Sequence, residues 1–268
     1  TPIFFLLAAI FSQLLLIDAN CTAAPGSLHR NMARLLYSVP DSPANTEPID
    51  IKCSAIILNS FWLMSPASCL FDHSNPALYK IKVHSPDGSM DPKSSPLVAN
   101  KVYIIAVDTY KTTDSHLDYP KPTFNNELGA GYDFALINVL TKMTTECSVE
   151  LHQEQTFDKC YLISWSEKEK KFLDKPITVE VKPDSCQFAK HIITNDAVSR
   201  LVECAQGTVC KGQTGAVILC NGMTQSDSHN FYLRDISSWA DTFCATNTAN
   251  FYTKLSPYFQ SINRTISL

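Results

Sequence analysis

Residues 53–69 read CSAIILNSFWLMSPASC. A run of aliphatic and β-branched residues lies between two cysteines, and Trp62 follows that run. Short apolar runs of this composition, bounded by turn residues, are typical of β-strands. The segment therefore predicts strand structure, and it provides a pattern to look for in the rest of the chain.

Similar short apolar runs recur on both sides of this segment, with turn residues between them. They cover residues 51–58, 79–83, 102–107, 134–140, 161–165, 177–181, 216–220 and 251–255. Many short strands without long helical periods predict an all-β barrel or sandwich. The tail differs, because Tyr258, Phe259, Ile262 and Ile266 are spaced like one face of a helix. We therefore expect an all-β fold that ends in a C-terminal helix.

Size and composition limit the classes of function. The 268 residues suffice for one large domain or two small ones, and 45% of them are hydrophobic. The net charge is −4, and the densest basic segment, residues 168–171, is short and mixed in sign, so nucleic-acid binding is not expected. The sequence contains no C-x-x-C pair, calcium loop, P-loop or dinucleotide motif. We therefore expect neither a metal ion nor a cofactor.

The first residues have the composition of a targeting segment. Residues 3–17 are mostly apolar, a length that is marginal for a bilayer and suits the core of a signal peptide. We expect residues 1–20 to be a signal peptide, shortened at its start and cleaved near Ala19 or Asn20. Residues 21–268 are then a secreted, extracellular domain without stable membrane insertion. A buried core helix is the alternative interpretation of residues 3–17.

Cysteines and sequons agree with a secreted chain. The ten cysteines are Cys21, Cys53, Cys69, Cys147, Cys160, Cys186, Cys204, Cys210, Cys220 and Cys244. An even number in a secreted chain predicts disulfides, although the count alone does not give their pairing. Two N-x-T sequons make Asn20 and Asn263 candidate glycosylation sites, and Asn20 counts only if it survives signal cleavage.

Three segments together resemble the chymotrypsin-like (trypsin-like) serine protease family. Residues 53–69 resemble the family segment that runs from a cysteine through a strand and a tryptophan to Thr-Ala-Ala-His-Cys. YDFALINVL, residues 132–140, is similar to Asp-Ile-Ala-Leu-Leu and its strand. CKGQTGAVILC, residues 210–220, is similar to Cys-x-Gly-Asp-Ser-Gly-Gly-Pro-x-x-Cys. Further matches follow in order: CYLISW at 160–165, SSWADTFC at 237–244 and NFYTKLSPYFQSI at 250–262.

The resemblance covers residues 34–268 and implies a fold and a disulfide pairing. The implied fold is two packed six-stranded antiparallel β-barrels with a C-terminal helix. The implied pairs are Cys53–Cys69, Cys160–Cys220, Cys186–Cys204, Cys210–Cys244 and Cys21–Cys147. The last pair would match the bridge that tethers a propeptide in chymotrypsin-like members. Every cysteine is used, and each native bridge in such a domain stabilises by roughly 2–5 kcal/mol.

The catalytic triad that the resemblance implies is degenerate. The family's chemistry needs a serine nucleophile, a histidine base and an aspartate that orients the histidine. Asp133 falls at the aspartate position, but Ser68 stands at the histidine position and Thr214 at the nucleophile position. A serine hydroxyl does not accept a proton near neutral pH as imidazole does. Without a base, the Thr214 hydroxyl has nothing to activate it.

The positions that the resemblance assigns to activation and to the substrate pocket also depart from the family pattern. Gln213 replaces the aspartate that pairs with a new Ile-Val-Gly-Gly terminus, and no such terminus sequence occurs. Gly212 remains at an oxyanion-hole position. Thr208 stands at the bottom of the pocket, while Ala240 and Asn250 replace two glycines that leave it open. The substrate pocket is therefore expected to be narrowed.

These departures predict a catalytically inactive serine protease homologue that acts by binding an extracellular protein. Loops on a rigid barrel are suited to present a recognition surface. Three alternatives remain: a weakly active serine-type endopeptidase, a decoy that holds a protease substrate or inhibitor, and a decayed copy without a role. The narrowed pocket disfavours the decoy, because a decoy must grip a substrate side chain.

Overall fold

The computed structural model describes about half of the chain, mainly its strands and the C-terminal helix. The described residues are 28–43, 46–70, 75–83, 88–90, 94–103, 133–143, 149–151, 157–177, 179–180, 201–206, 214–222, 231–237 and 249–267. The segment predicted to be a signal peptide lies outside these residues.

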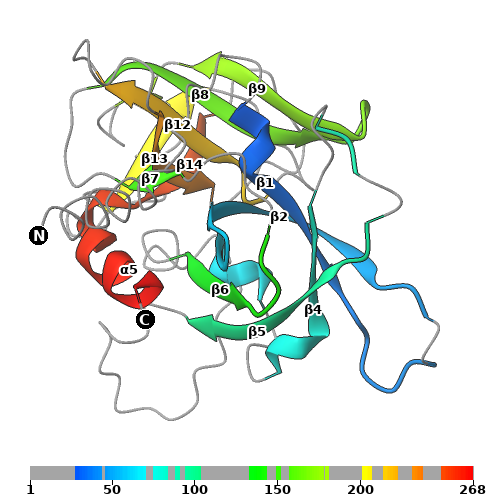
Figure 1. Cartoon of the computed structure of the whole chain (residues 1–268). Coiled ribbons are helices and arrows are strands. Elements are labelled where there is room, and N and C mark those ends of the chain that lie inside the picture. The colour runs from blue at the N-terminus through cyan, green and yellow to red at the C-terminus, as the bar shows by residue number, and fades with distance from the viewer. Residues whose placement is uncertain are drawn as a thin grey trace, which may run out of the picture.

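The first half of the chain forms a closed antiparallel barrel, with strand order β1-β2-β3-β6-β5-β4 and β4 pairing with β1 (Figure 1). Its strands are β1 (Met32–Tyr37), β2 (Ile49–Asn59), β3 (Trp62–Ser65), β4 (Tyr79–Val83), β5 (Leu97–Tyr103) and β6 (Ala135–Val139). Three short 3₁₀ helices accompany them: η1 (Leu28–Asn31), η2 (Ala67–Cys69) and η3 (Pro76–Leu78). Closure pairs the backbone N–H and C=O groups that the strands at an open sheet edge would leave without hydrogen-bond partners.

The strands β3 and β6 and the second half of β2 are buried on both faces, which explains why they are continuous apolar runs, whereas β4 and β5 have half-buried or exposed lysines. In β2, Ala55 and Ile57 point into the barrel, whereas Ile56 and Leu58 join a different core on its outside. Because successive side chains of a strand point to opposite faces, a strand buried on both sides needs an apolar residue at every position.

The second half of the chain forms an eight-stranded sheet with the path β10-β11-β14-β13-β12-β8-β9, and β7 pairs in parallel with β13. Its strands are β7 (Glu150–Leu151), β8 (Phe157–Ser166), β9 (Lys171–Ile177), β10 (Val179–Glu180), β11 (Val202–Gln206), β12 (Val217–Gly222), β13 (Phe231–Ser237) and β14 (Ala249–Lys254). In the described residues no pairing joins β10 to β9. The second six-stranded barrel is therefore not confirmed and stays a prediction.

The largest core lies where the barrel, the sheet and the C-terminal helix meet. It joins Met64 and Leu136 of the barrel to Val217 and Leu233 of the sheet and to Ile262. The helix, η6 (Ser256–Tyr258) followed by α5 (Phe259–Ile266), confirms the prediction from the apolar spacing of the tail. Ile262 is fully buried, as expected for the apolar face of a surface helix.

A buried arginine adds a polar contact between barrel and sheet. The Arg34 side chain, on β1, is fully buried, and its guanidinium carbon lies 5.0 Å from the ring centroid of Trp165 on β8. Arg34 Nη1 also donates a hydrogen bond of 3.2 Å to Ser54 Oγ on β2. A guanidinium can stack on an aromatic face while its N–H groups stay hydrogen-bonded, which makes its burial tolerable.

A second buried ionic cluster lies on β11, β13 and β14. Arg234 donates from Nε and Nη2 to the two carboxylate oxygens of Glu203, at 2.8 and 2.9 Å, and Lys254 Nζ lies 3.1 Å from Glu203 Oε1. Burial alone would raise the pKa of Glu203, but the hydrogen bonds and charges of Arg234 and Lys254 outweigh it and lower that pKa. Asp235 is fully buried, and burial together with the neighbouring Glu203 charge raises its pKa well above the usual range.

The fold is mostly β, with a closed six-stranded antiparallel barrel, a second sheet and a C-terminal helix, as predicted. In the part of the chain that is described, no helix combines the length and hydrophobicity required to cross a membrane.

Candidate functional site

Ser68 and Asp133 lie in direct contact at one end of the barrel. β3 pairs with β6 so that Ser65 lies opposite Ala135, and this register brings together the residues just after β3 and just before β6. Ser68 sits in η2, which follows Pro66, and Asp133 lies two residues before Ala135, the first residue of β6. The site is thus positioned by two adjacent strands of the closed barrel.

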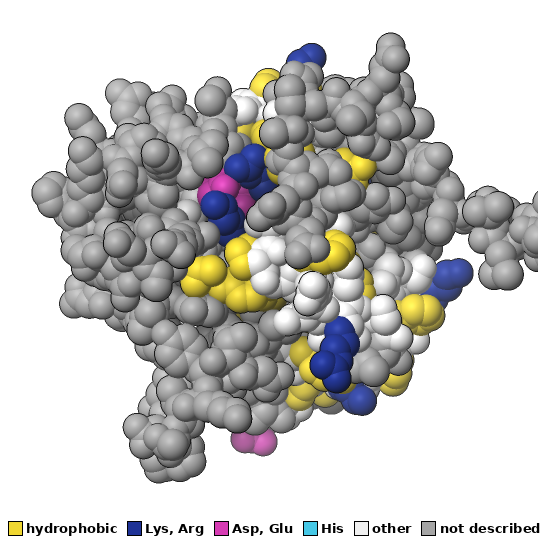
Figure 2. Space-filling model, turned by 90° about the vertical axis from the view of Figure 1, so that its left-hand side faces the viewer, with side chains coloured by type: hydrophobic (Ala, Val, Ile, Leu, Met, Phe, Trp, Pro, Cys, Tyr) yellow, Lys and Arg dark blue, Asp and Glu magenta, His cyan; other side chains and the backbone are white. Residues whose placement is uncertain are grey.

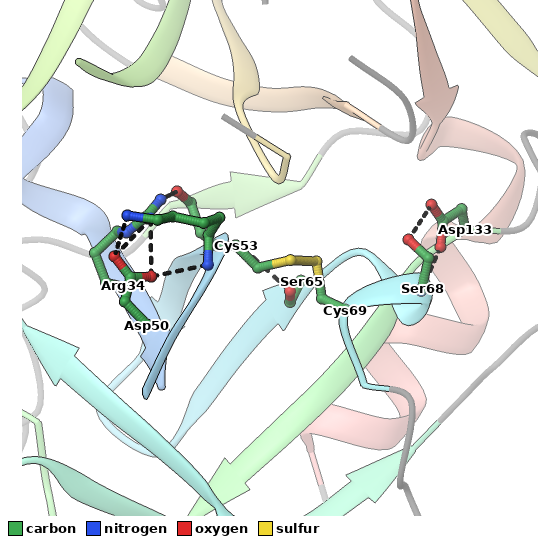
Figure 3. Close-up of a disulfide and its surroundings, with 9 residues drawn as sticks. Arg34, Asp50, Cys53, Ser65, Ser68, Cys69 and Asp133 are labelled. Atoms are coloured by element: carbon green, nitrogen blue, oxygen red, sulfur yellow. Dashed lines mark hydrogen bonds and ion pairs between the residues drawn. A yellow bond between two sulfur atoms is a disulfide. The ribbon is translucent and has the colours of Figure 1, made fainter. Parts of the chain in front are cut away.

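The carboxylate of Asp133 accepts two hydrogen bonds from Ser68. The backbone N–H of Ser68 donates to Asp133 Oδ1 at 2.7 Å, and its hydroxyl donates to Oδ2 at 2.8 Å (Figure 3). Asp133 is only 3% exposed. Hydrogen bonds to a carboxylate favour its ionised form and are about twice as strong as bonds between neutral groups. The arrangement fixes the Ser68 hydroxyl as a donor toward Asp133.

Thr214 is held against the same end of the barrel through its backbone. It forms an isolated parallel bridge with Cys53, and its carbonyl oxygen accepts a hydrogen bond of 2.8 Å from Ser54 N. Cys53 forms a disulfide with Cys69, the residue that follows Ser68. The three positions aligned with the triad therefore lie at the same end of the barrel. Ser68 and Asp133 are joined by direct hydrogen bonds, whereas Thr214 is connected to them through Cys53 of β2 and the Cys53–Cys69 disulfide.

Gly215 makes this close approach possible. Its φ is +85°, and a Cβ added there would lie 2.2 Å from the carbonyl oxygen of Ser54. Its N–H donates to Ser237 O at 3.3 Å. Only glycine fits a left-handed conformation pressed against a neighbouring backbone. Sequence reasoning missed Gly215, although it is one of only eight glycines in the chain and follows the nucleophile position directly.

Two of the five disulfide pairs that the resemblance implies lie in the described residues. Cys53–Cys69 joins β2 to η2 beside Ser68, and Cys160–Cys220 joins the neighbouring strands β8 and β12. The structure therefore contains disulfide bonds, as the even number of cysteines predicts. The pairs Cys21–Cys147, Cys186–Cys204 and Cys210–Cys244 each include at least one cysteine outside the described residues.

Several other predicted site residues also lie outside them. These are Thr208, Gly212, Gln213, Ala240 and Asn20. Asn250 is described only as part of the β14 backbone, where it pairs with Ala205. Asn263 is a half-buried residue of α5 whose carbonyl oxygen accepts from Ser267 Oγ at 2.7 Å. Glycosylation of Asn263 stays a prediction.

Within the described ranges, no group of three His, Cys, Asp or Glu side chains is placed to hold a metal ion. A scan against protein-family models finds no match to the chain. The candidate site therefore rests on the two hydrogen bonds between Ser68 and Asp133, on the backbone contacts of Thr214 with Cys53 and Ser54, and on the resemblance of the surrounding segments.

Proposed function

We propose that the chain is a secreted, catalytically inactive homologue of the chymotrypsin-like serine proteases, and that it acts by binding another extracellular protein. The observation that carries this proposal is the hydrogen bond from the Ser68 hydroxyl to Asp133. It occupies the contact that a histidine base would make with the orienting aspartate. The second six-stranded barrel implied by the same resemblance is part of the proposal.

The chemistry of this pair supports loss of catalysis. The base of a triad must take a proton from the nucleophile, stay charged through the transition state and return the proton to the leaving group. A serine hydroxyl is not a base near neutral pH, and in this site its proton already points to Asp133. Thr214 is therefore left without a group that could activate its hydroxyl.

The barrel itself supports a binding role. A closed barrel with a disulfide beside the site gives a rigid support on which loops can present a surface. Two buried ionic clusters and a core buried on both faces of the barrel wall keep this support well ordered. A chain that had lost every role would be under no pressure to keep these costly buried charges paired.

The proposal is tested by two measurements on the secreted chain. Hydrolysis of peptide ester and amide substrates should not exceed background, and Thr214→Ala should leave the measured rate unchanged. Affinity capture from the native fluid should give a specific, saturable protein partner. Turnover that follows the folded protein and disappears in Thr214→Ala would contradict the loss of catalysis, and the absence of any saturable partner would contradict the binding role.

A further inference from the structure

A groove lies on the barrel surface next to the end of α5, away from Ser68 and Asp133. Its volume is about 590 Å³, within the range of roughly 300–1,000 Å³ typical of ligand sites. The turn between β2 and β3, the strands β5 and β6 and the last turn of α5 form its walls. Strand pairing places Trp62, Asn138 and Lys101 side by side in one row across β3, β6 and β5.

One side of the groove is aromatic and partly exposed. The rings of Trp62 and Tyr103 pack with their centroids 5.5 Å apart, and Phe61 is 43% exposed at the turn. Leu140, which follows β6, is 76% exposed, and the preceding residue Val139 donates its N–H to Phe61 O at 3.0 Å. Large apolar side chains that gather at the surface next to a groove are typical of binding sites.

One amide side chain of the groove presents donors. The Oδ1 atom of Asn59 accepts from the N–H of Phe61 at 2.9 Å. The Phe61 N–H can only donate, so the oxygen of Asn59 must face it and the Asn59 NH₂ group faces away. Asn138 is already engaged at both ends of its amide, because its Oδ1 atom accepts from Asn100 Nδ2 at 2.9 Å and its Nδ2 atom donates to Phe61 O at 3.3 Å. The N–H groups of Asn59 therefore remain as donors, which suits a ligand with acceptor oxygens.

Lys101 adds a positive charge to these donors. Its side chain is exposed, and among the described residues it makes no ion pair. None of the described residues that line the groove is acidic, although the whole chain has 26 acidic and 22 basic residues. Figure 2 shows the face that carries α5, where hydrophobic side chains lie next to Lys and Arg side chains, some of which have Asp or Glu neighbours. The described lining of the groove therefore complements an anionic ligand that also has an apolar part.

We propose that this groove docks an acidic peptide segment of the partner protein. An aromatic or aliphatic side chain of the segment packs against Phe61 and Trp62, and a neighbouring Asp or Glu pairs with Lys101. This inference rests on the proposed protein-binding function. A peptide fits better than a small molecule, because small-molecule sites enclose most of their ligand, whereas Phe61 and Leu140 extend the apolar surface beyond the groove.

The test uses defined peptides and the full secreted chain. Three fluorescently labelled probes share one length: acetyl-Glu-Asp-Leu-Phe-Glu-Asp-amide, the same peptide with Gln and Asn in place of Glu and Asp, and the same peptide with Ser-Ser in place of Leu-Phe. Fluorescence anisotropy gives a Kd for each. The acidic Leu-Phe probe should bind saturably, and the other two should bind roughly tenfold more weakly, because each lacks one of the two contacts.

Two variants assign the binding to the groove. Lys101→Glu should raise the Kd of the acidic Leu-Phe probe by roughly three- to tenfold and remove the salt dependence of its binding. Phe61→Ser should raise the same Kd by roughly tenfold, because it removes an aromatic side chain against which the peptide packs. Lys159→Glu on β8, another exposed lysine, which lies in the other sheet, is the matched control and should leave the Kd unchanged.

The outcomes separate this inference from the function on which it rests. Equal binding of the acidic probe to Lys101→Glu and to the unaltered chain would overturn the inference, and so would failure of the probe to bind. Tighter binding of 3-phenylpropionate than of the acidic peptide would identify a small-molecule site instead. If the captured partner binds Lys101→Glu and Phe61→Ser as well as it binds the unaltered chain, the groove inference fails while the protein-binding function stands.

Discussion

Nη2 of Arg34 donates hydrogen bonds to both carboxylate oxygens of Asp50, at 2.9 and 3.0 Å. The arginine is fully buried on β1, whereas the Asp50 side chain at the start of β2 is 34% exposed. The guanidinium also contacts Ser54 and stacks on Trp165 (Figure 3 shows the Asp50 contact). One side chain therefore links two strands of the barrel to the second sheet.

Replacing Arg34 should destabilise the fold strongly. Arg34→Met removes the hydrogen bonds to Asp50 and the contact with Trp165, and we expect a loss of about 2–4 kcal/mol in the free energy of unfolding. Urea denaturation measures this loss. The control is Lys52→Met, because the Lys52 side chain is 53% exposed and lies 3.5 Å from the same carboxylate. It should cost less than about 1 kcal/mol, and equal costs for the two variants would contradict a special role of the buried guanidinium.

Alanine at Gly215 should be far more harmful than alanine at Gly88, the other described glycine with a positive φ. Gly88 has φ +84°, and a Cβ there would meet Phe172 O at 2.9 Å and the flexible His29 side chain at 3.0 Å. At Gly215 the Cβ would collide with backbone at 2.2 Å. We expect about 1–2 kcal/mol for Gly88→Ala and about 3 kcal/mol or more for Gly215→Ala. Thermal unfolding of the two variants measures both losses of stability. A smaller loss for Gly215→Ala than for Gly88→Ala would contradict the prediction.

The sequence predicted the parts of the fold in which each strand is continuously apolar. Residues 51–58 and 134–140 correspond closely to β2 and β6, and the tail forms α5. The run at 177–181 corresponds instead to the end of β9 and to β10, which are separate strands. Continuous apolar runs locate a buried strand well, but they do not show where one strand ends and the next begins.

Three of the strands that the apolar runs did not locate carry buried charges. β1 contains Arg34, β11 contains Glu203, and β13 contains Asp235. Charged residues ordinarily indicate exposed positions, and their burial depends on partners distant in sequence. Asp50 lies 16 residues from Arg34, and Glu203 lies 31 residues from Arg234. Local patterns contain no information on such pairs.

The sequence predicted the positions of the candidate site but not the contacts that its residues make. Ser68, Asp133 and Thr214 were located through the segments that surround them, and the structure brings their positions together. The resemblance did not show that the Ser68 hydroxyl would bind Asp133 or that Gly215 would be pressed against Ser54. Both depend on the register of strands that are far apart in the chain.

Two acidic side chains of the same cluster should affect stability with opposite pH dependence. Burial raises the pKa of Asp235, so the folded chain keeps a proton that the unfolded chain has lost, and stability falls as pH rises above about 4. Asp235→Asn has no carboxyl group to titrate, so it lacks this loss of stability. The stability of the variant relative to the unaltered chain should therefore increase with pH. Urea denaturation at pH 4, 6 and 8 measures the change, and a relative decrease would show that Asp235 is an ionised, paired carboxylate.

Glu203→Gln is the matched comparison. The charges of Arg234 and Lys254 lower the pKa of Glu203 against the effect of burial, so its ionised form stabilises the fold above the unfolded pKa of about 4.3. That contribution is lost as pH falls through the lower, folded-state pKa. Glu203→Gln should therefore lose stability relative to the unaltered chain as pH rises through this window, and it should show a constant deficit above it.

Rebuilding the triad alone should not produce a protease. In Ser68→His with Thr214→Ser, the backbone N–H of residue 68 can still hold Asp133 Oδ1, and Oδ2 becomes available to an imidazole N–H. The base and nucleophile are thereby restored next to Asp133. An oxyanion hole contributes separately, and loss of one donor costs roughly 10²–10³ in kcat. On the resemblance, Gln213 and the absent Ile-Val-Gly-Gly terminus leave that hole unordered, and Ala240 and Asn250 narrow the pocket.

We therefore expect the double variant to remain close to background with trypsin-, chymotrypsin- and elastase-type substrates. The measurement is the initial rate of hydrolysis at neutral pH, with the unaltered chain as the baseline. A second variant that also carries Gln213→Asp and an engineered, cleavable Ile-Val-Gly-Gly start should be faster than the simple double variant, because it restores the ion pair that orders the oxyanion hole in active members. If the simple double variant reaches the rates of active proteases, only the triad was lost, and the proposed loss of the activation switch is wrong.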